Sequence, residues 1–315
     1  MEQIKLDLNS NILNYNPSVS VVIPTSNRDE LKKTLSSLRN QSFRDFEILI
    51  VSKKMDERLK KLAHDYDAQV LEDNGRGRCY ARNLGAKKAR GKVIAFIDDD
   101  VELERNWLEV VMKNFRSSQI GGVGGVPEGT RNLSDSVTYS IFLKPIIFLF
   151  QLRQIHCWNM YSEHKVSIDF LSGTNMAFSK EAVLRAGGFD ENFYEPADSE
   201  DLDFCLRVRD MGYYLILDPS ARARHNCDYL QRVLVHRKDP NYFLSVADNS
   251  AYCRAKNKVY KNVGWCVFFL HEILNAVLLS NVSANKLVFF SYLRGVFKGY
   301  VRGKSVKAKS VDERR

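Results

Sequence analysis

The chain has 315 residues and a formal net charge of +9, with 47 Lys and Arg residues against 38 Asp and Glu residues. Hydrophobic residues make up 44% of the chain, which excludes a globally disordered protein and allows one large domain with an appended region. The basic excess indicates a polyanionic partner, either nucleic acid, acidic lipid or a phosphorylated substrate.

Short apolar segments that predict strands recur through the first hundred residues. Residues 19–23 form a β-branched run that ends at Pro24, and similar strands are predicted at 46–51, 69–71 and 93–97. Helical patterns separate these strands. Such alternation predicts an α/β fold, a mostly parallel sheet with helices on both faces, in which ligands bind beyond the carboxyl ends of the strands.

The helices between these strands are predicted from leucine spacing and from end signals. Leu31, Leu35 and Leu38 fall at helical spacing, and Asn27 and Asp29 are the expected capping residues. Two more helices are expected at residues 55–66 and 79–90, the second ending at Gly91.

The pattern changes after a further helix at 107–115. The expected elements, in order, are a strand-like stretch at 121–125, an apolar run at 141–152, a strand at 168–178 containing a Gly-Thr-Asn turn, helices at 180–186 and 200–211, and strands at 213–217 and 221–224.

The last third of the chain is apolar and basic. Residues 263–279 are strongly apolar but include His271, Glu272 and Asn275, which argues against a membrane-spanning helix. Residues 286–301 interleave apolar, aromatic and basic side chains, and residues 294–315 contain eight basic and two acidic residues. This composition suits the surface of an anionic membrane, although a helical pair packed on the domain and followed by a disordered tail explains it equally well.

The six cysteines and the N-terminus bear on the compartment. No two cysteines have disulfide-framework or zinc-site spacing, and residues 1–16 are polar rather than signal-like. We therefore expect reduced thiols and a cytoplasmic protein, peripheral at the inner face of the cell membrane.

Two acidic clusters are the main candidates for chemistry. Asp98, Asp99 and Asp100 follow a buried strand, where three adjacent carboxylates repel one another unless a cation compensates them. Oxygen ligands of this kind suit Mg²⁺ or Mn²⁺. Glu200 and Asp201 open a predicted helix, where they serve either as helix-end charges or as the carboxylate that acid–base chemistry requires.

Basic and imidazole side chains complete the candidate set. Residues 75–78 (Gly-Arg-Gly-Arg) lie before a helix and suit either a diphosphate or a solvated turn. His225 follows a strand-like segment and is a candidate metal ligand, although a lone histidine is more often structural.

Taken in order, these residues resemble the GT-A-fold glycosyltransferases of family 2 over residues 19–225. The resemblance lies in Val-Ser-Val-Val-Ile-Pro-Thr-Ser-Asn-Arg (19–28), Leu-Ser-Ser-Leu-Arg-Asn-Gln-Ser-Phe (35–43), Ala-Arg-Asn-Leu-Gly (81–85), the segment 89–100 that ends in the three aspartates, Gly-Gly-Phe-Asp-Glu (187–191) and the pair Glu200-Asp201. The family implies an inverting transfer of a sugar from a nucleotide-diphosphate sugar to a hydroxyl acceptor, in cell-surface polysaccharide, glycolipid or lipid-linked glycan synthesis.

The resemblance also implies a role for each matching residue. Asp201 is the implied general base, with Glu200 supporting the acceptor. The metal, Mn²⁺ or Mg²⁺, is implied to bind Asp98 and Asp100, with His225 near the diphosphate. The implied donor-binding residues are Pro24, Thr25, Arg28, Arg82, Asp98 and Asp99, of which Asp99 would reach the ribose and Arg82 the phosphates.

One segment departs from the family pattern. The second strand usually ends in an acidic pair that helps to recognise the base, whereas this chain has Val-Ser-Lys-Lys-Met-Asp at 51–56. Lys53 therefore stands where an aspartate is expected, and Ser26 where an aromatic residue is frequent. A UDP-sugar is the default donor, with GDP and dTDP open.

Three regions and three functions follow. The expected regions are an N-terminal extension (1–18), a GT-A domain (19–228, with a nucleotide-sugar half at 19–120 and an acceptor half at 121–228) and a helical, basic C-terminal region (229–315).

Glycosyl transfer is the favoured function, and two alternatives stay open: a nucleotidyltransferase, which should carry a glycine-rich signature near the first strand, and a non-enzymatic basic binding protein. Because the basic surplus lies largely in the C-terminal tail, we expect no nucleic-acid partner, but a saccharide or lipid-linked acceptor and an anionic membrane.

Overall fold

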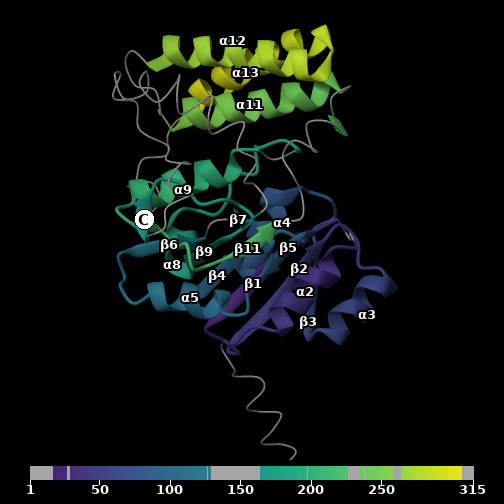
Figure 1. The fold of residues 1–315 in the computed structure, drawn as a ribbon, viewed down its shortest axis with the longest axis vertical. Helices are drawn as coiled ribbons and strands as arrows, with labels where there is room; N and C mark the ends of the chain where they lie inside the picture. The colour runs from purple at the N-terminus through teal and green to yellow at the C-terminus, as the bar shows by residue number, and fades with distance from the viewer. Residues whose placement is uncertain are drawn as a thin grey trace, which may run out of the picture.

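The computed structural model describes residues 17–26, 29–125, 127–128, 164–196, 198–225, 235–236, 239–257 and 264–306. Figure 1 shows an α/β domain with a central sheet and, stacked on one side of it, a layer of C-terminal helices. The apolar run at 141–152, the capping candidate Asn27, the donor candidate Arg28 and the basic tail after residue 306 lie outside the described residues.

The central sheet has eight strands in the order β3-β2-β1-β4-β9-β6-β10-β8. Six strands run parallel, whereas β9 runs antiparallel between β4 and β6, and β8 pairs antiparallel with β10. The mostly parallel α/β fold predicted from the sequence is therefore confirmed. The strands are β1 (Val19–Thr25), β2 (Phe46–Ser52), β3 (Ala68–Glu72), β4 (Val93–Phe96), β6 (Ile120–Gly124), β8 (Val166–Ile168), β9 (Met176–Ser179) and β10 (Tyr214–Leu217).

Helices cover both faces of this sheet, which is why its inner strands are apolar throughout. Along β4 the side chains alternate, so that Val93 and Ala95 join one core while Ile94 and Phe96 join the other. The first core is covered by α2 (Leu31–Arg39), α3 (Glu57–Asp65) and α5 (Trp107–Asn114). The second is covered by α4 (Arg78–Lys88), α8 (Lys180–Arg185) and α9 (Glu200–Asp210).

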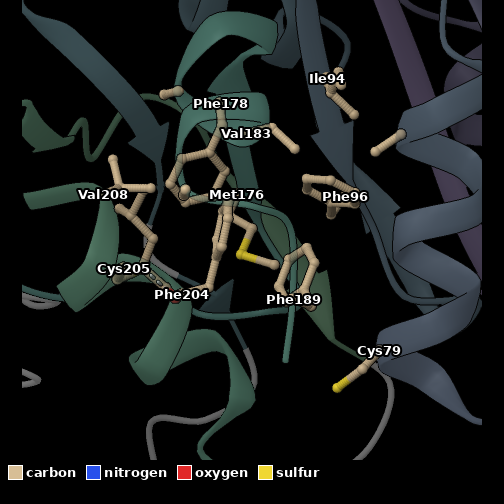
Figure 2. Packing of buried hydrophobic residues seen from close by; sticks show 14 of the residues in the cluster. Cys79, Ile94, Phe96, Met176, Phe178, Val183, Phe189, Phe204, Cys205 and Val208 are labelled. Carbon is tan, nitrogen blue, oxygen red and sulfur yellow. Dashed lines mark hydrogen bonds between the residues drawn. The ribbon is translucent and has the colours of Figure 1, made fainter. Parts of the chain in front are cut away.

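An aromatic cluster fixes α9 against the strands β4 and β9 (Figure 2). Phe204 of α9 stacks on Phe189 with ring centroids 4.4 Å apart, and its edge contact with Phe178 of β9 measures 4.8 Å. Phe189 also meets Phe96 of β4 edge-on at 5.0 Å. Because these rings are buried and interlocked, the start of α9 is held near the carboxyl end of β4.

A small second sheet continues directly from the three aspartates. It has the order β5-β11-β7, formed by β5 (Val101–Leu103), β7 (Pro127–Glu128) and β11 (Ala223–His225). β11 pairs antiparallel with β5, which places His225 opposite Val101. A residue far along the chain is thereby brought next to Asp100.

The C-terminal layer consists of α11 (Pro240–Lys256), α12 (Gly264–Ser283) and α13 (Lys286–Ser305), with an apolar core of its own. Within the described ranges, none of the helices combines the length and apolarity that a bilayer crossing requires. The helical C-terminal region was predicted, but α11 was not.

Two local predictions were wrong. Residues 168–178 do not form one strand, because a turn in which the N–H of Asn175 donates to Ser172 separates β8 at the sheet edge from β9 at its centre. Asp29 does not cap α2, whose N-cap is Glu30 without a side-chain hydrogen bond. The carboxylate of Asp29 instead pairs with Arg58, which removes it from the helix end.

Candidate active site

The three aspartates lie at the carboxyl end of β4, next to the carboxyl end of β1. β1 and β4 run parallel with Val22 opposite Phe96, so Thr25 and Asp98 emerge at the same edge of the sheet. β9 runs the opposite way, with Met176 opposite Phe96, and the turn that precedes it enters at that edge too. The edge therefore collects residues from three separate parts of the chain.

Asp98, Asp100 and His225 form a group that could hold a metal ion. One potential ligand atom from each residue lies within 4.8 Å of the others. Nε2 of His225 lies 3.2 Å from Oδ1 of Asp100, and both side chains are 7% exposed. Two carboxylates and an imidazole in this arrangement fit a divalent cation that keeps further positions open for phosphate oxygens.

Asp99, the middle aspartate, faces the end of β1 instead. Its Oδ2 accepts a hydrogen bond of 2.6 Å from the hydroxyl of Thr25 and one of 3.3 Å from the N–H of Ser26. Its main-chain carbonyl accepts a hydrogen bond from the hydroxyl of Thr34 in α2. Asp99 thus ties the turn after β1, where donor-binding residues were predicted, to the metal candidate group.

Arg82 of α4 joins the two acidic clusters. One terminal nitrogen lies 2.7 Å from Oε1 of Glu200, and the other lies 3.1 Å from Oδ1 of Asp98 and donates to the carbonyl of Gly173. The whole residue has no exposed surface. A donor phosphate could reach this guanidinium only if the carboxylates around it moved, so the predicted phosphate contact of Arg82 stays a prediction.

Asp201 is held at the start of α9 by main-chain donors. The N–H of Gly173 donates to its Oδ2 at 2.9 Å, and the N–H of Leu202 donates to its Oδ1 at 2.8 Å. Burial, followed by the adjacent Glu200 carboxylate, raises the pKa of Asp201 to about 7, although Arg82 and the Gly173 N–H act in the opposite direction. A carboxylate with a pKa near neutrality is suited to general-base catalysis.

Not every predicted donor residue enters this network. Pro24 lies in β1 opposite Val51, one residue before Thr25, and contributes no side-chain hydrogen bond. Arg28 lies outside the described residues. Lys53, which replaces the expected aspartate, follows β2 and lies over Gly75, where a Cβ would approach its Cε to 2.9 Å.

Sequence reasoning missed Gly173 and Thr34. A Cβ on Gly173 would come within 2.9 Å of the Arg82 guanidinium and 3.2 Å of the Asp201 carboxylate, so only glycine leaves room for both. The turn at 173–175 was visible in the sequence, but its place beside the site depends on the antiparallel insertion of β9. Thr34 could not be distinguished from any other helical threonine.

The comparisons decide the family. The family model described as glycosyl transferase family 2 matches residues 20–184, just over half of the chain. The chain belongs to this family. As a glycosyltransferase it is neither a nucleotidyltransferase nor a non-enzymatic binding protein, the two alternatives that the sequence left open.

Two relatives illustrate the range of similar proteins. The chain is 26% identical over 223 residues to a glucosyl-dolichyl phosphate glucuronosyltransferase of Haloferax volcanii, covering 66% of this chain and 68% of that protein. It is 27% identical over 240 residues to a chondroitin synthase of Escherichia coli. That match covers 66% of this chain but only 34% of the synthase, so this chain spans about a third of that enzyme's length.

A solved structure shares the fold. The mannosyltransferase PcManGT from Pyrobaculum calidifontis, in complex with GDP-Man and Mn²⁺, superposes with a TM-score of 0.55 at 16% identity. The superposition covers 91% of this chain and 88% of that one, so the GT-A likeness includes most of the described elements.

Proposed function

We propose that this glycosyltransferase transfers a sugar from a nucleotide-diphosphate sugar to a hydroxyl acceptor with inversion at the anomeric carbon. The observation that carries the proposal is Arg82, whose guanidinium binds Asp98 of the metal candidate group and Glu200 beside Asp201. Cation-binding groups and a carboxylate of raised pKa therefore lie at one edge of the sheet. A single displacement requires a cation on the leaving-group side and a base on the acceptor side of the same anomeric carbon.

Asp98, Asp100 and His225 would hold the metal ion, and Mn²⁺ is favoured over Mg²⁺ because the set includes an imidazole nitrogen. When bound, the ion would neutralise the charge that develops on the departing nucleoside diphosphate. Arg82 keeps Asp98 and Glu200 in place through its buried contacts.

Asp201 would take the proton of the acceptor hydroxyl while the new bond to the anomeric carbon forms and the bond to the diphosphate oxygen breaks. Its Oδ2 is already fixed by the Gly173 N–H, which orients the carboxylate before substrate binds. Glu200 remains paired with Arg82 and supports the acceptor side.

The donor and acceptor are proposed as classes. A UDP-sugar remains the default donor, and the GDP-mannose bound by PcManGT keeps GDP open alongside dTDP. The acceptor is a saccharide or a lipid-linked glycan. The Haloferax volcanii relative is named for a dolichyl phosphate substrate, and together with the basic C-terminal region this supports peripheral contact with an anionic membrane. The inner face of the cell membrane is part of the proposal.

The test is donor turnover with and without Mn²⁺. Wild-type protein is screened with UDP-, GDP- and dTDP-sugars for release of nucleoside diphosphate. Asp100→Ala removes a ligand whose ion is worth several kcal/mol in the transition state, so turnover should fall about 100-fold or more. Asp65→Ala, at an exposed position in α3, is the matched control. Full turnover by Asp100→Ala, or turnover in wild type without any metal, would contradict the proposal.

A further inference from the structure

Exposed apolar side chains concentrate on the two last helices. Of the thirteen large hydrophobic residues that are exposed among the described residues, eight lie on α12 and α13. The α/β domain contributes only scattered ones, such as Leu184 and Tyr214. Single exposed apolar residues are normal, whereas a continuous set on neighbouring helices marks an interaction surface.

On α13 the exposed residues share one side of the helix with basic residues. Leu287, Phe290, Phe297 and Val301 are between 51% and 68% exposed. At about 100° per residue they fall, with the exposed Lys286, Arg294, Lys298 and Lys304, within an arc of roughly 120°. The opposite side holds the buried residues, including Val288, Tyr292 and Val296. The helix therefore presents an aromatic and basic face along its whole length.

The outer helix α12 presents a second apolar arc. Leu270, Ile273, Leu274 and Val277 recur at spacings of three and four residues and are between 43% and 59% exposed. The only carboxylate of the two helices, Glu272, is buried and accepts a hydrogen bond from the hydroxyl of Tyr292. No exposed acidic residue of α12 or α13 therefore opposes a negatively charged surface.

We propose that the exposed arcs of α12 and α13 dock this protein on an anionic lipid bilayer, with both helices lying in the plane of the membrane surface. Charge decides between a bilayer and a second copy of this chain. A two-fold contact through the same face would bring two rows of Lys and Arg together, whereas phospholipid headgroups neutralise them. Basic residues recur along α13, so the helix lies flat rather than inserting end-on.

The docking helices are fixed to the side of the site that the acceptor would approach. Arg302 of α13 donates to the carbonyl of Asn192 and binds the buried carboxylate of Asp248 in α11. Residue 192 belongs to the segment that leads into Glu200 and Asp201. Resting on the proposed function, this link favours a lipid-linked acceptor over a free saccharide.

The test is flotation of the full chain with phosphatidylcholine vesicles, with and without phosphatidylglycerol. Wild type should float with the anionic vesicles. Phe290→Glu with Phe297→Glu removes two rings from the face, and binding should fall at least about tenfold. Leu184→Glu with Tyr214→Glu makes the same charge change on the α/β domain and should bind like wild type.

A second pair of variants tests charge without touching the apolar side chains. Lys286→Gln with Arg294→Gln should weaken binding to anionic vesicles by about fivefold for each charge, and salt should abolish the difference. Failure of wild type to float, equal flotation of the Phe290 and Phe297 variant, or a dimer in solution that this variant abolishes would each overturn the proposal.

Release of nucleoside diphosphate in the absence of vesicles separates docking from catalysis. A wild-type protein that floats but turns over no donor would leave the docking surface in place and remove the proposed function. A wild-type protein that turns over donor but does not float would keep the proposed function and overturn the docking proposal.

Discussion

The protonation state of the Asp201 carboxylate should determine how kcat depends on pH. Its pKa is raised to about 7 by burial and by the carboxylate of Glu200, with Arg82 acting against them. A general base works only when deprotonated, so kcat should rise with pH, pass its half-maximal value near pH 7 and level off about one pH unit or more above that. An aspartate with its ordinary pKa would give the half-maximal rate near pH 4.

Two substitutions assign this profile to Asp201. Asp201→Asn should lower kcat by about 10²–10⁴-fold with little change in the donor KM, because it removes the base and leaves the donor site intact. Asp198→Asn is the control, since the negative charge of Asp198 also raises the pKa of Asp201. It should keep the shape of the profile and move its midpoint to lower pH. A profile that is unchanged in Asp201→Asn would assign the titration elsewhere.

The sequence alone could place Asp98, Asp99 and Asp100 but not their partners. The position of the aspartates follows from a general rule, because a strand that ends in polar residues presents them at the binding edge of a parallel sheet. The pairing of His225 with Asp100 needs the antiparallel contact of β5 and β11, and no local pattern encodes that contact. Arg82 was predicted to lie at the site, yet its salt bridge to Glu200 depends on how α4 and α9 pack.

At the scale of helices, three glycines allow α13 to pack closely on α11. Gly295, Gly299 and Gly303 recur every fourth residue, so they lie on one side of the helix. A Cβ at Gly295 would lie 2.2 Å from the carbonyl oxygen of Leu244, and one at Gly299 would lie 2.0 Å from that of Asp248. The backbone of α13 thus rests directly on the backbone of α11.

Gly299→Ala should therefore loosen the C-terminal layer. Overpacking costs about 1–3 kcal/mol, and the clash with a backbone carbonyl places this case at the upper end. The better helix propensity of alanine offsets up to about 1 kcal/mol, which leaves a net loss of roughly 2 kcal/mol in the free energy of unfolding. Equilibrium unfolding in denaturant measures this loss in the free energy of unfolding. Val301→Ala, at an exposed position of the same helix, should change stability by less than about 0.5 kcal/mol, and an equal loss there would refute the packing argument.

Local sequence patterns predicted a helix or strand well where the apolar pattern of the element itself is strong. The strands β1, β2 and β4 were found because strands buried on both faces are apolar throughout. The helix α11 was missed although Asp239 caps it and Pro240 opens it, because its small buried residues Ala247 and Ala251 give a weak apolar pattern. Two strands were merged at 168–178 because the turn between them carries β9 to the sheet centre, a distant position that spacing does not encode.

Over the whole molecule, the C-terminal layer is joined to the α/β domain both by apolar packing and by polar contacts. Tyr252 and Cys253 of α11 join the core that α4, α8 and α9 cover. Asn249 of α11 accepts a hydrogen bond from the N–H of Tyr194 and donates to the carbonyls of Tyr194 and Pro196. Lys256 of the same helix pairs with Asp190 and with the buried Asp203 of α9. The segment 190–196, which leads to Glu200 and Asp201, is thus held by α11, the helix on which the proposed membrane-facing helix α13 packs.

Asn249→Ala should consequently affect the acceptor side and spare the donor side. It removes three hydrogen bonds to the segment 190–196 and one from Arg302, all made by a fully buried amide, and a loss of about 1–3 kcal/mol falls on that segment. Transfer to acceptor should fall about tenfold, whereas the affinity for nucleoside diphosphate with Mn²⁺, measured by calorimetry, should stay as in wild type. Asn114→Ala, which removes hydrogen bonds to Val110 and Asp218, is the matched control and should leave both unchanged. If Asn249→Ala weakened nucleotide binding as much as transfer, the segment would act on the whole site, and the C-terminal layer would have no particular connection to the acceptor.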